Sequence, residues 1–376
     1  MTEAREITDL TICRAFFAAW VFCYHVDLYL GLAHRLGPFA GWLGRGYLGV
    51  DGFFLLSGLI LAHTHREFSP GVPGRFAPQA WRFYGSRLAR IYPVHAATLC
   101  LLAALLLLAR MHGVFPREAS RFGLAPLLEN VALIQGWGFA DVGGWNYPAW
   151  SISTEWAGYL LFPLIWWALC RCGALVAGHM VLVSFLILGL LVSWHHNSLN
   201  FGVSQGLLRF FPEFLVGMGT ARLLPHLAGR VPARGLALAG LALVAAGAEC
   251  GRDWLVALGL WLLLAGFVTR HEAGWPPLLG RPAALLAFGR LSYAFYMSFA
   301  IAELLLVNLF RRHGWVPTSH PGVFAGGMFT MTLALAVALH LAVERPSRQE
   351  SGRFFQKAAA FFPCFTRQIC LVRKPL

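Results

Sequence analysis

Long apolar stretches recur along most of the chain and are separated by short polar segments. Most of them run for about 17 residues or more, the length at which a helix crosses the hydrocarbon core of a bilayer. The pattern predicts an all-α integral membrane protein with about ten transmembrane helices. Their expected ranges are 11–31, 46–64, 93–109, 154–170, 174–193, 204–223, 235–250, 254–270, 284–310 and 322–343.

The composition supports this class. Of the 376 residues, 58% are hydrophobic and only 12% are charged, which excludes a soluble globular protein. The first ten residues are mixed in charge and contain no basic region followed by a cleavage site. The first apolar stretch is therefore expected to remain as a spanning helix and not to be removed as a signal peptide.

The basic residues predict the orientation in the membrane, because cytoplasmic loops carry the excess of Lys and Arg. With the N-terminus inside, twenty of the 30 Lys and Arg residues fall on the cytoplasmic side and eight on the other. We therefore expect both termini in the cytoplasm, a polytopic membrane domain over 1–348 and a basic cytoplasmic tail over 349–376. Anionic membrane lipid accounts for the net charge of +13, so no nucleic-acid partner is expected.

Two ionisable side chains stand inside the first apolar stretch. Arg14 and His25 are eleven residues apart, close to three helical turns, so both lie on one helix face about 16 Å apart. Ionisable groups at this depth cost a few kcal/mol and indicate a functional site. The ordinary alternative is an interfacial arginine and a histidine bonded to a neighbouring helix.

The second apolar stretch carries an acid among glycines. Gly49, Gly52 and Gly58 allow another backbone or a narrow ligand to approach, and Asp51 is an acid in an apolar run. Counted from the helix ends, Asp51 and His25 lie at similar depth in the outer half of the membrane. We therefore expect Asp51 to pair with His25, fix its tautomer and stabilise the imidazolium.

The fourth helix begins with a polar run, Trp150-Ser151-Ile152-Ser153-Thr154-Glu155. N-capping is the ordinary explanation for Ser151. The functional interpretation places Glu155 on the outer side, near His25 and Asp51.

Three further patterns are expected to be structural. The arginine and aromatic stretch over 81–93 is typical of a helix on the membrane surface. Arg209 and Glu213 are spaced as an ion pair on one helix. Cys170-Arg171-Cys172 lacks the second pair of ligands that a zinc site needs, so no metal is expected.

Taken in order, these motifs make the chain resemble the acyltransferase-3 family of integral membrane O-acyltransferases over about residues 8–348. The matching elements are Arg14 with His25, Gly49 to Gly58, Arg87-Leu88-Ala89-Arg90-Ile91-Tyr92-Pro93, Trp150 to Glu155, Ser292-Tyr293 and Glu344-Arg345-Pro346. Many members carry a histidine seven residues after the serine of the Ser-Tyr motif. Here that position is Phe299, so the role of that histidine does not carry over.

The resemblance implies an acyl-CoA donor, usually acetyl-CoA, and a hydroxyl acceptor on a carbohydrate or cell-surface glycan. It implies a multi-pass protein of the bacterial inner membrane with no permanently bound cofactor. Coenzyme A is polyanionic and cytoplasmic, so we expect arginines near the inner face to hold its phosphates. The expected substrate-binding residues are Arg14, Ser57, Gly58, Arg87, Arg90 and Ser151.

His25 is then expected to deprotonate the acceptor hydroxyl, with Asp51 and Glu155 as the other catalytic residues. An acyl-histidine intermediate is also open. The competing class is a transporter or flippase of lipid-linked sugar that uses the same buried charges. A noncatalytic membrane scaffold explains none of the ordered polar motifs.

Overall fold

The computed structural model describes residues 6–33, 37–65, 68, 76–114, 119–139, 144–201 and 203–349. These residues form helices and loops, and no strand occurs among them. The expected tail over 349–376 lies outside the described residues except for its first position. The α-helices are α1 Thr8–Leu30, α2 Ala40–Gly44, α3 Gly49–Thr64, α4 Phe76–Met111, α5 Leu124–Ala132, α6 Trp150–Arg171, α7 Ala174–Trp194, α8 Gly206–Leu227, α9 Ala233–Glu249, α10 Asp253–Glu272, α11 Ala283–Arg312 and α12 Pro321–Leu339.

Short helical turns connect several of these helices. The 3-10 turns are η2 Gly37–Phe39, η3 Gly46–Leu48, η5 Ala119–Phe122, η6 Tyr147–Ala149, η7 Val203–Gln205 and η8 Pro317–Ser319. A π-helical turn, η9 His340–Glu344, continues α12. Turns of the π type are often found at functional sites, because they rotate the side chains that follow them.

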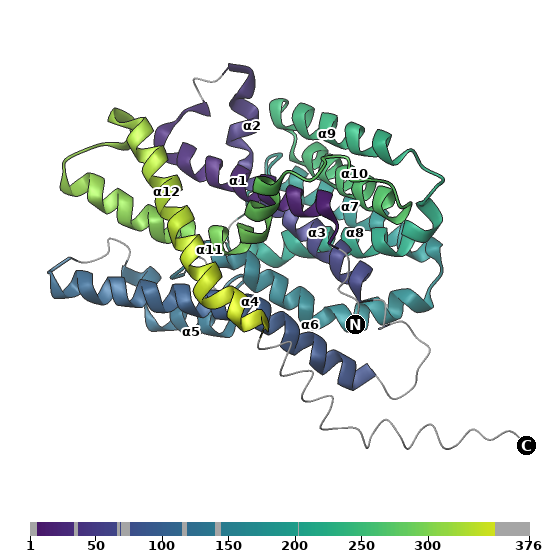
Figure 1. Ribbon diagram of the computed structural model, residues 1–376, viewed down its shortest axis with the longest axis horizontal. Helices are drawn as coiled ribbons and strands as arrows, with labels where there is room; N and C mark the ends of the chain where they lie inside the picture. Colours follow the sequence, from purple (N-terminus) through teal and green to yellow (C-terminus); the bar gives the residue numbers. More distant parts are fainter. Residues whose placement is uncertain are drawn as a thin grey trace, which may run out of the picture.

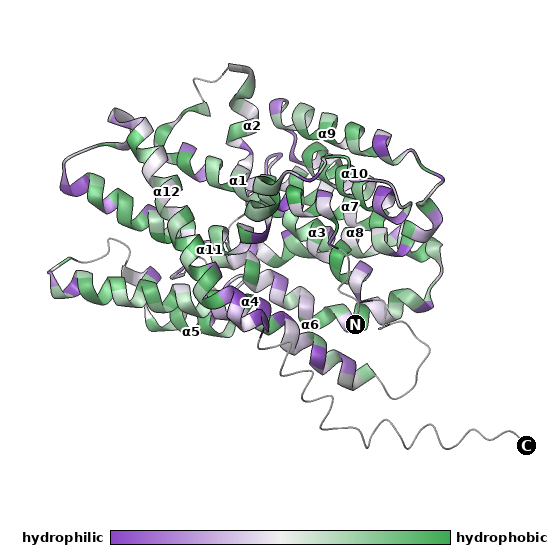
Figure 2. Cartoon of the chain, in the orientation of Figure 1, coloured by the Kyte–Doolittle hydropathy of each residue, from purple (hydrophilic) through white to green (hydrophobic). Residues whose placement is uncertain are grey.

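Each of the ten predicted spans contains a helix. Within the part of the chain that the structure describes, six helical stretches are long and apolar enough to cross a membrane, and Figure 2 shows hydrophobic residues along much of the helical ribbon. They are Gly46–Thr64, Gln79–Met111, Ala174–Trp194, Asp253–Glu272, Ala283–Arg312 and Pro321–Gln349. The protein is therefore an all-helical, multi-pass membrane protein, while the total of ten spans and the cytoplasmic termini stay predictions.

One predicted element is wrong. The stretch over 81–93 is not a separate surface helix, because α4 runs without a break through Pro93. Neighbouring elements hold the helix just before this proline. Tyr293 of α11 donates a hydrogen bond to the Ile91 carbonyl, and the Tyr92 hydroxyl bonds to Val131 at 3.1 Å. As a result Arg87 and Arg90 stand on the same continuous helix as the predicted span over 93–109.

Glycines set the packing around α3. A Cβ atom at Gly49 would collide with the Phe17 carbonyl of α1, and one at Gly58 with the Phe214 carbonyl of α8. The glycines of this motif therefore bring α3 into backbone contact with its two neighbours. Gly58 faces α8 and does not line the cavity described below, and its role in substrate binding stays a prediction.

The helices around α1 and α3 form the centre of the molecule (Figure 1). α1 packs against α11 and α3, and α3 packs against α8. α9 and α10 form a closely packed pair at one side of Figure 1, and α11 and α12 form another at the opposite side. The first half of α1 and the second half of α3 are thereby brought next to α4 and α6.

Candidate functional site

A cavity of about 740 Å³ lies between α1, α3, α4, α6 and α11. This is within the size range of small-molecule and cofactor sites. The cavity follows α1 only as far as Arg14, while α3 contributes residues from Val50 to Thr64. Of the predicted site residues it brings together Arg14, Ser57, Arg87, Arg90, Ser151 and Glu155.

Four arginines line this cavity. Arg14, Arg87 and Arg90 were expected from the sequence, and Arg348 was missed. All four side chains are half-buried. Four guanidinium groups on the wall of one cavity make a strong site for a polyanion, because each offers a fixed fork of N–H donors.

Arg348 is brought to the cavity by η9. The buried Glu344 carboxylate accepts a hydrogen bond from the Arg348 guanidinium and one from His340 Nδ1 at 2.8 Å. The sequence signal was the Glu344-Arg345-Pro346 motif, but Arg348 lies two residues beyond it. Only the tertiary structure, in which η9 packs against α4, shows that it faces the cavity.

Glu155 lies among these cations and not in the layer of His25. Its Oε1 accepts hydrogen bonds from the Ser57 hydroxyl at 2.7 Å and from the Tyr159 hydroxyl at 2.6 Å. The predicted position beside His25 and Asp51 is therefore wrong. Helix α6 begins at Trp150, and Glu155 lies one turn beyond Ser151, farther along the cavity from His25. The single carboxylate partly offsets the arginine charge and fixes the Ser57 side chain.

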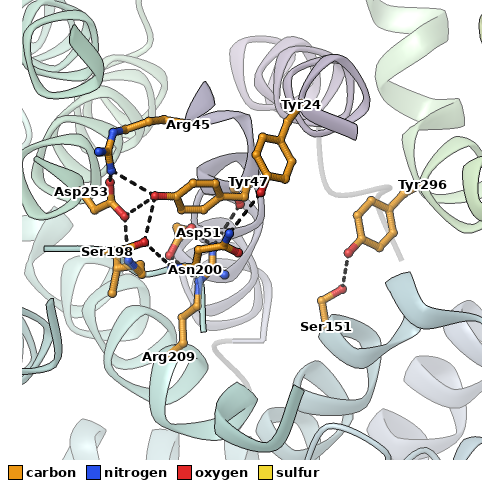
Figure 3. A network of polar contacts seen from close by, with 11 residues as sticks. Tyr24, Arg45, Tyr47, Asp51, Ser151, Ser198, Asn200, Arg209, Asp253 and Tyr296 are labelled. Atoms are coloured by element: carbon orange, nitrogen blue, oxygen red, sulfur yellow. Dashed lines mark hydrogen bonds and ion pairs between the residues drawn. The ribbon is translucent and has the colours of Figure 1, made fainter. Parts of the chain in front are cut away.

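The cavity ends at a small hydrogen-bonded group on α6 and α11. Ser151 donates to the Tyr296 hydroxyl at 3.0 Å, and Tyr296 donates to the Pro148 carbonyl at 3.0 Å (Figure 3). Beyond this point the Phe299 ring lies 5.7 Å from the Tyr296 ring. The cavity thus stops at an aromatic layer.

His25 lies directly behind this layer and does not line the cavity. Its ring is 4.6 Å from the Phe299 ring, and its Nδ1 is 3.2 Å from the Tyr147 hydroxyl. The Tyr147 hydroxyl is also 2.7 Å from Glu303 Oε2, and the Tyr29 hydroxyl is 2.6 Å from Glu303 Oε1. Tyr147 and Glu303 were not expected from the sequence, although Glu303 is an acid inside an apolar helix.

The predicted pair of His25 and Asp51 is wrong. Asp51 is fully buried and accepts two hydrogen bonds from Arg209 of α8, whose side chain is also buried. Arg209 donates in addition to the Tyr47 carbonyl at 3.0 Å. The two residues were predicted at similar depth, but their side chains point to different neighbours, Asp51 to Arg209 and His25 to Tyr147. Asp51 therefore joins α3 to α8 and does not contact the imidazole.

Asp51 and Arg209 belong to a buried polar network (Figure 3). Tyr47 donates to Asp253 Oδ2 at 2.6 Å, and Arg45 forms an ion pair with the same carboxylate. The expected ion pair of Arg209 with Glu213 is also wrong, because Arg209 bonds to Asp51 in its place. The network joins α3, α8 and α10, and none of these residues lines the cavity.

Polar residues line the end of the cavity away from Ser151. They include Glu6, His63 and His271. A hydrogen bond and the charge of Arg290 hold the pKa of Glu6 below its ordinary value of 4.5. Among the described residues no group of three or more His, Cys, Asp or Glu side chains is arranged to hold a metal ion.

Comparisons with known proteins agree on one class. The sequence model of a family described as an acyltransferase domain, Acyl_transf_3, matches residues 7–341. The chain is 28% identical over 340 residues to a protein named acyltransferase MdmB from Streptomyces mycarofaciens, and the match covers 82% of each chain. No solved structure matches the chain.

Proposed function

The chain belongs to the acyltransferase-3 family, as the resemblance of its motifs indicated, and from this premise we propose that it moves an acyl group from acyl-CoA to a hydroxyl of a carbohydrate or cell-surface glycan. The cavity with four arginines on its wall is the observation that supports acyl-CoA as the donor. A polyanion the size of coenzyme A is the ligand class that such a wall fits.

The donor is proposed to lie along α1. Its phosphates bind Arg87, Arg90 and Arg348, and Arg14 holds the part that leads toward the reacting end. The pantetheine arm follows α3 past Ser57, which Glu155 holds in place. The thioester then reaches the Ser151 and Tyr296 end of the cavity.

The chemistry is assigned to His25. The Phe299 ring of the aromatic layer lies between the Tyr296 end of the cavity and His25, so the reaction requires this ring to move when the donor binds. His25 then removes the proton of the acceptor hydroxyl as the oxygen attacks the thioester carbonyl, a role worth about 10²–10⁴-fold in rate. The route through an acyl-histidine uses the same residue.

The remaining parts of the proposal follow from the family and the chemistry. The acyl group is proposed to be acetyl, the protein to lie in the bacterial inner membrane, and the acceptor to approach His25 from the side opposite the arginines. Membrane lipid surrounds the apolar helices. Acyl-CoA is a substrate in this proposal and not a resident cofactor.

The first experiment follows the release of coenzyme A thiol from acetyl-CoA by purified protein in nanodiscs, with glycan acceptors present. We expect turnover by the wild type and none by His25→Ala of equal yield and thermal stability. Mass spectrometry of surface glycans, with and without the gene, identifies the acceptor. Transport of a lipid-linked sugar without thiol release would favour the transporter in place of the enzyme.

The second experiment tests the donor site in detergent without anionic lipid, where attraction to the membrane surface is absent. Arg87→Gln, Arg90→Gln and Arg348→Gln are each expected to raise the KM for acyl-CoA about tenfold, equivalent to about 1.4 kcal/mol. Arg345→Gln is the matched control, because Arg345 is exposed and does not line the cavity. An unchanged KM in all three variants would remove the donor site from the cavity.

A further inference from the structure

His25 belongs to a hydrogen-bonded chain that the sequence does not reveal. The chain runs from His25 Nδ1 to the Tyr147 hydroxyl at 3.2 Å and from there to Glu303 Oε2 at 2.7 Å. Its members come from α1, η6 and α11, so it exists only in the assembled fold. We propose that Tyr147 and Glu303 are positioning residues that hold His25 in the tautomer with its proton on Nδ1, and this rests on the proposed function.

The distances assign the direction of the hydrogen bonds. Two tyrosine hydroxyls approach Glu303 at 2.6 and 2.7 Å, the range of hydroxyl bonds to an ionised carboxylate. A carboxylate only accepts, so Tyr147 gives its single proton to Glu303. The oxygen of Tyr147 then has only acceptor capacity left for His25. The imidazole must therefore donate from Nδ1, which leaves Nε2 unprotonated as the base.

The surroundings support an ionised Glu303. The guanidinium of Arg121 lies 5.1 Å from the centre of the Tyr147 ring, which places a positive charge beside the bonded pair. Among the described residues, Tyr24 of α1 and Tyr147 of η6 contact the His25 ring. Glu303 of α11 bonds to Tyr147 and Tyr29, and the charges of Arg121 of η5 and Arg311 of α11 act on these tyrosines. Glu303 is the one carboxylate in this set that bonds to a partner of His25.

The reaction step balances with this assignment. The acceptor O–H bond breaks, its proton goes to Nε2, and its electron pair forms the new C–O bond at the thioester carbonyl. The C–S bond breaks, and the coenzyme A sulfur leaves and takes the proton from Nε2. Tyr147 keeps its proton throughout, and Glu303 stabilises the transient imidazolium through the Tyr147 hydroxyl. Asp51, which bonds to Arg209, has no part in this step.

The test compares Tyr147→Phe and Glu303→Gln with Tyr24→Phe as the matched control. Tyr24 precedes His25 on α1 and its ring contacts the imidazole, but its hydroxyl bonds to Asn200 at 3.1 Å (Figure 3). We expect the first two variants to lower kcat about tenfold or more, as part of the contribution of a general base, with an unchanged KM for acyl-CoA. The control should keep the wild-type kcat.

Two readouts separate positioning from a structural role. In Glu303→Gln the acid limb of the kcat profile should move to lower pH, because the imidazolium loses its carboxylate, and Glu303→Asp should restore part of the wild-type behaviour. Nitrogen-15 NMR of the imidazole, assigned by its absence in His25→Gln, should show Nδ1 protonated in the wild type. Tyr147→Phe should lose this preference.

The NMR measurement needs no turnover, so it separates the two proposals. A wild type that does not consume acyl-CoA would refute the proposed function. The positioning role of Tyr147 and Glu303 would then be decided by the His25 tautomer that NMR measures. An unchanged His25 tautomer in Tyr147→Phe, or a kcat of Tyr147→Phe as high as that of Tyr24→Phe, would overturn the positioning role. The proposed acyl transfer would still stand. If Glu303→Gln does not fold, Tyr147→Phe decides alone.

Discussion

Asp51→Asn tests whether Asp51 acts on the imidazole or holds the fold. The Asp51 side chain is fully buried and that of Arg209 is 2% exposed, so the pair has almost no access to water. Removing one partner of a buried pair leaves an uncompensated charge and costs about 3–5 kcal/mol. The buried Glu213 lies against the same pair and offers a second carboxyl, so we expect the lower end of this range.

The assay is thermal unfolding in detergent, followed by tryptophan fluorescence, together with kcat of the folded fraction. Asp51→Asn is expected to lower the melting temperature by roughly 5 °C and to leave kcat near the wild-type value. Arg290→Ala is the control, because Arg290 and Glu6 form a pair whose side chains are 58% and 44% exposed. Such a pair contributes about 0–1 kcal/mol, so the control should hardly change the melting temperature.

A double variant tests whether the lost stability comes from the unpaired buried charge. Asp51→Leu with Arg209→Met removes both charges, and replacement of a buried pair by apolar side chains is often neutral. We therefore expect it to recover most of the stability that Asp51→Asn loses. An Asp51→Asn protein with the wild-type melting temperature and no turnover would refute the structural role and return Asp51 to the catalytic site.

Three further outcomes are expected. Gly58→Val should prevent folding or lower the yield strongly, because its side chain meets the backbone of α8, and size-exclusion chromatography measures the folded fraction. Glu344→Gln should raise the KM for acyl-CoA a few-fold at constant kcat, because Arg348 loses its carboxylate; an unchanged KM would contradict this. The lowered pKa of Glu6 means that its bond with Arg290 stabilises the fold above about pH 4.5 and that this contribution disappears as the pH falls. The melting temperature of the wild type should therefore exceed that of Glu6→Gln slightly at about pH 7 and equal it at about pH 3, whereas a constant difference would contradict the assignment.

The sequence by itself determined the class of fold and several of the polar residues that line the cavity. Apolar length predicts helices regardless of their neighbours, and every predicted span contains one. Arg14, Arg87 and Arg90 were expected to bind phosphates because the family resemblance implies a polyanionic donor on the inner side of the membrane. The structure brings these three to one cavity, together with Ser57, Ser151 and Glu155.

Only the tertiary structure decided which side chains meet. Depth along a helix is a one-dimensional quantity, so it placed Asp51 level with His25 but gave no rotation about the helix axis. The rotation turns Asp51 to Arg209 and His25 to Tyr147. Glu303 is more than 270 residues from Tyr29 in the chain, and no local pattern predicts that they bond. The partners of a buried polar group are set by helix packing, because each must find a hydrogen bond inside the fold.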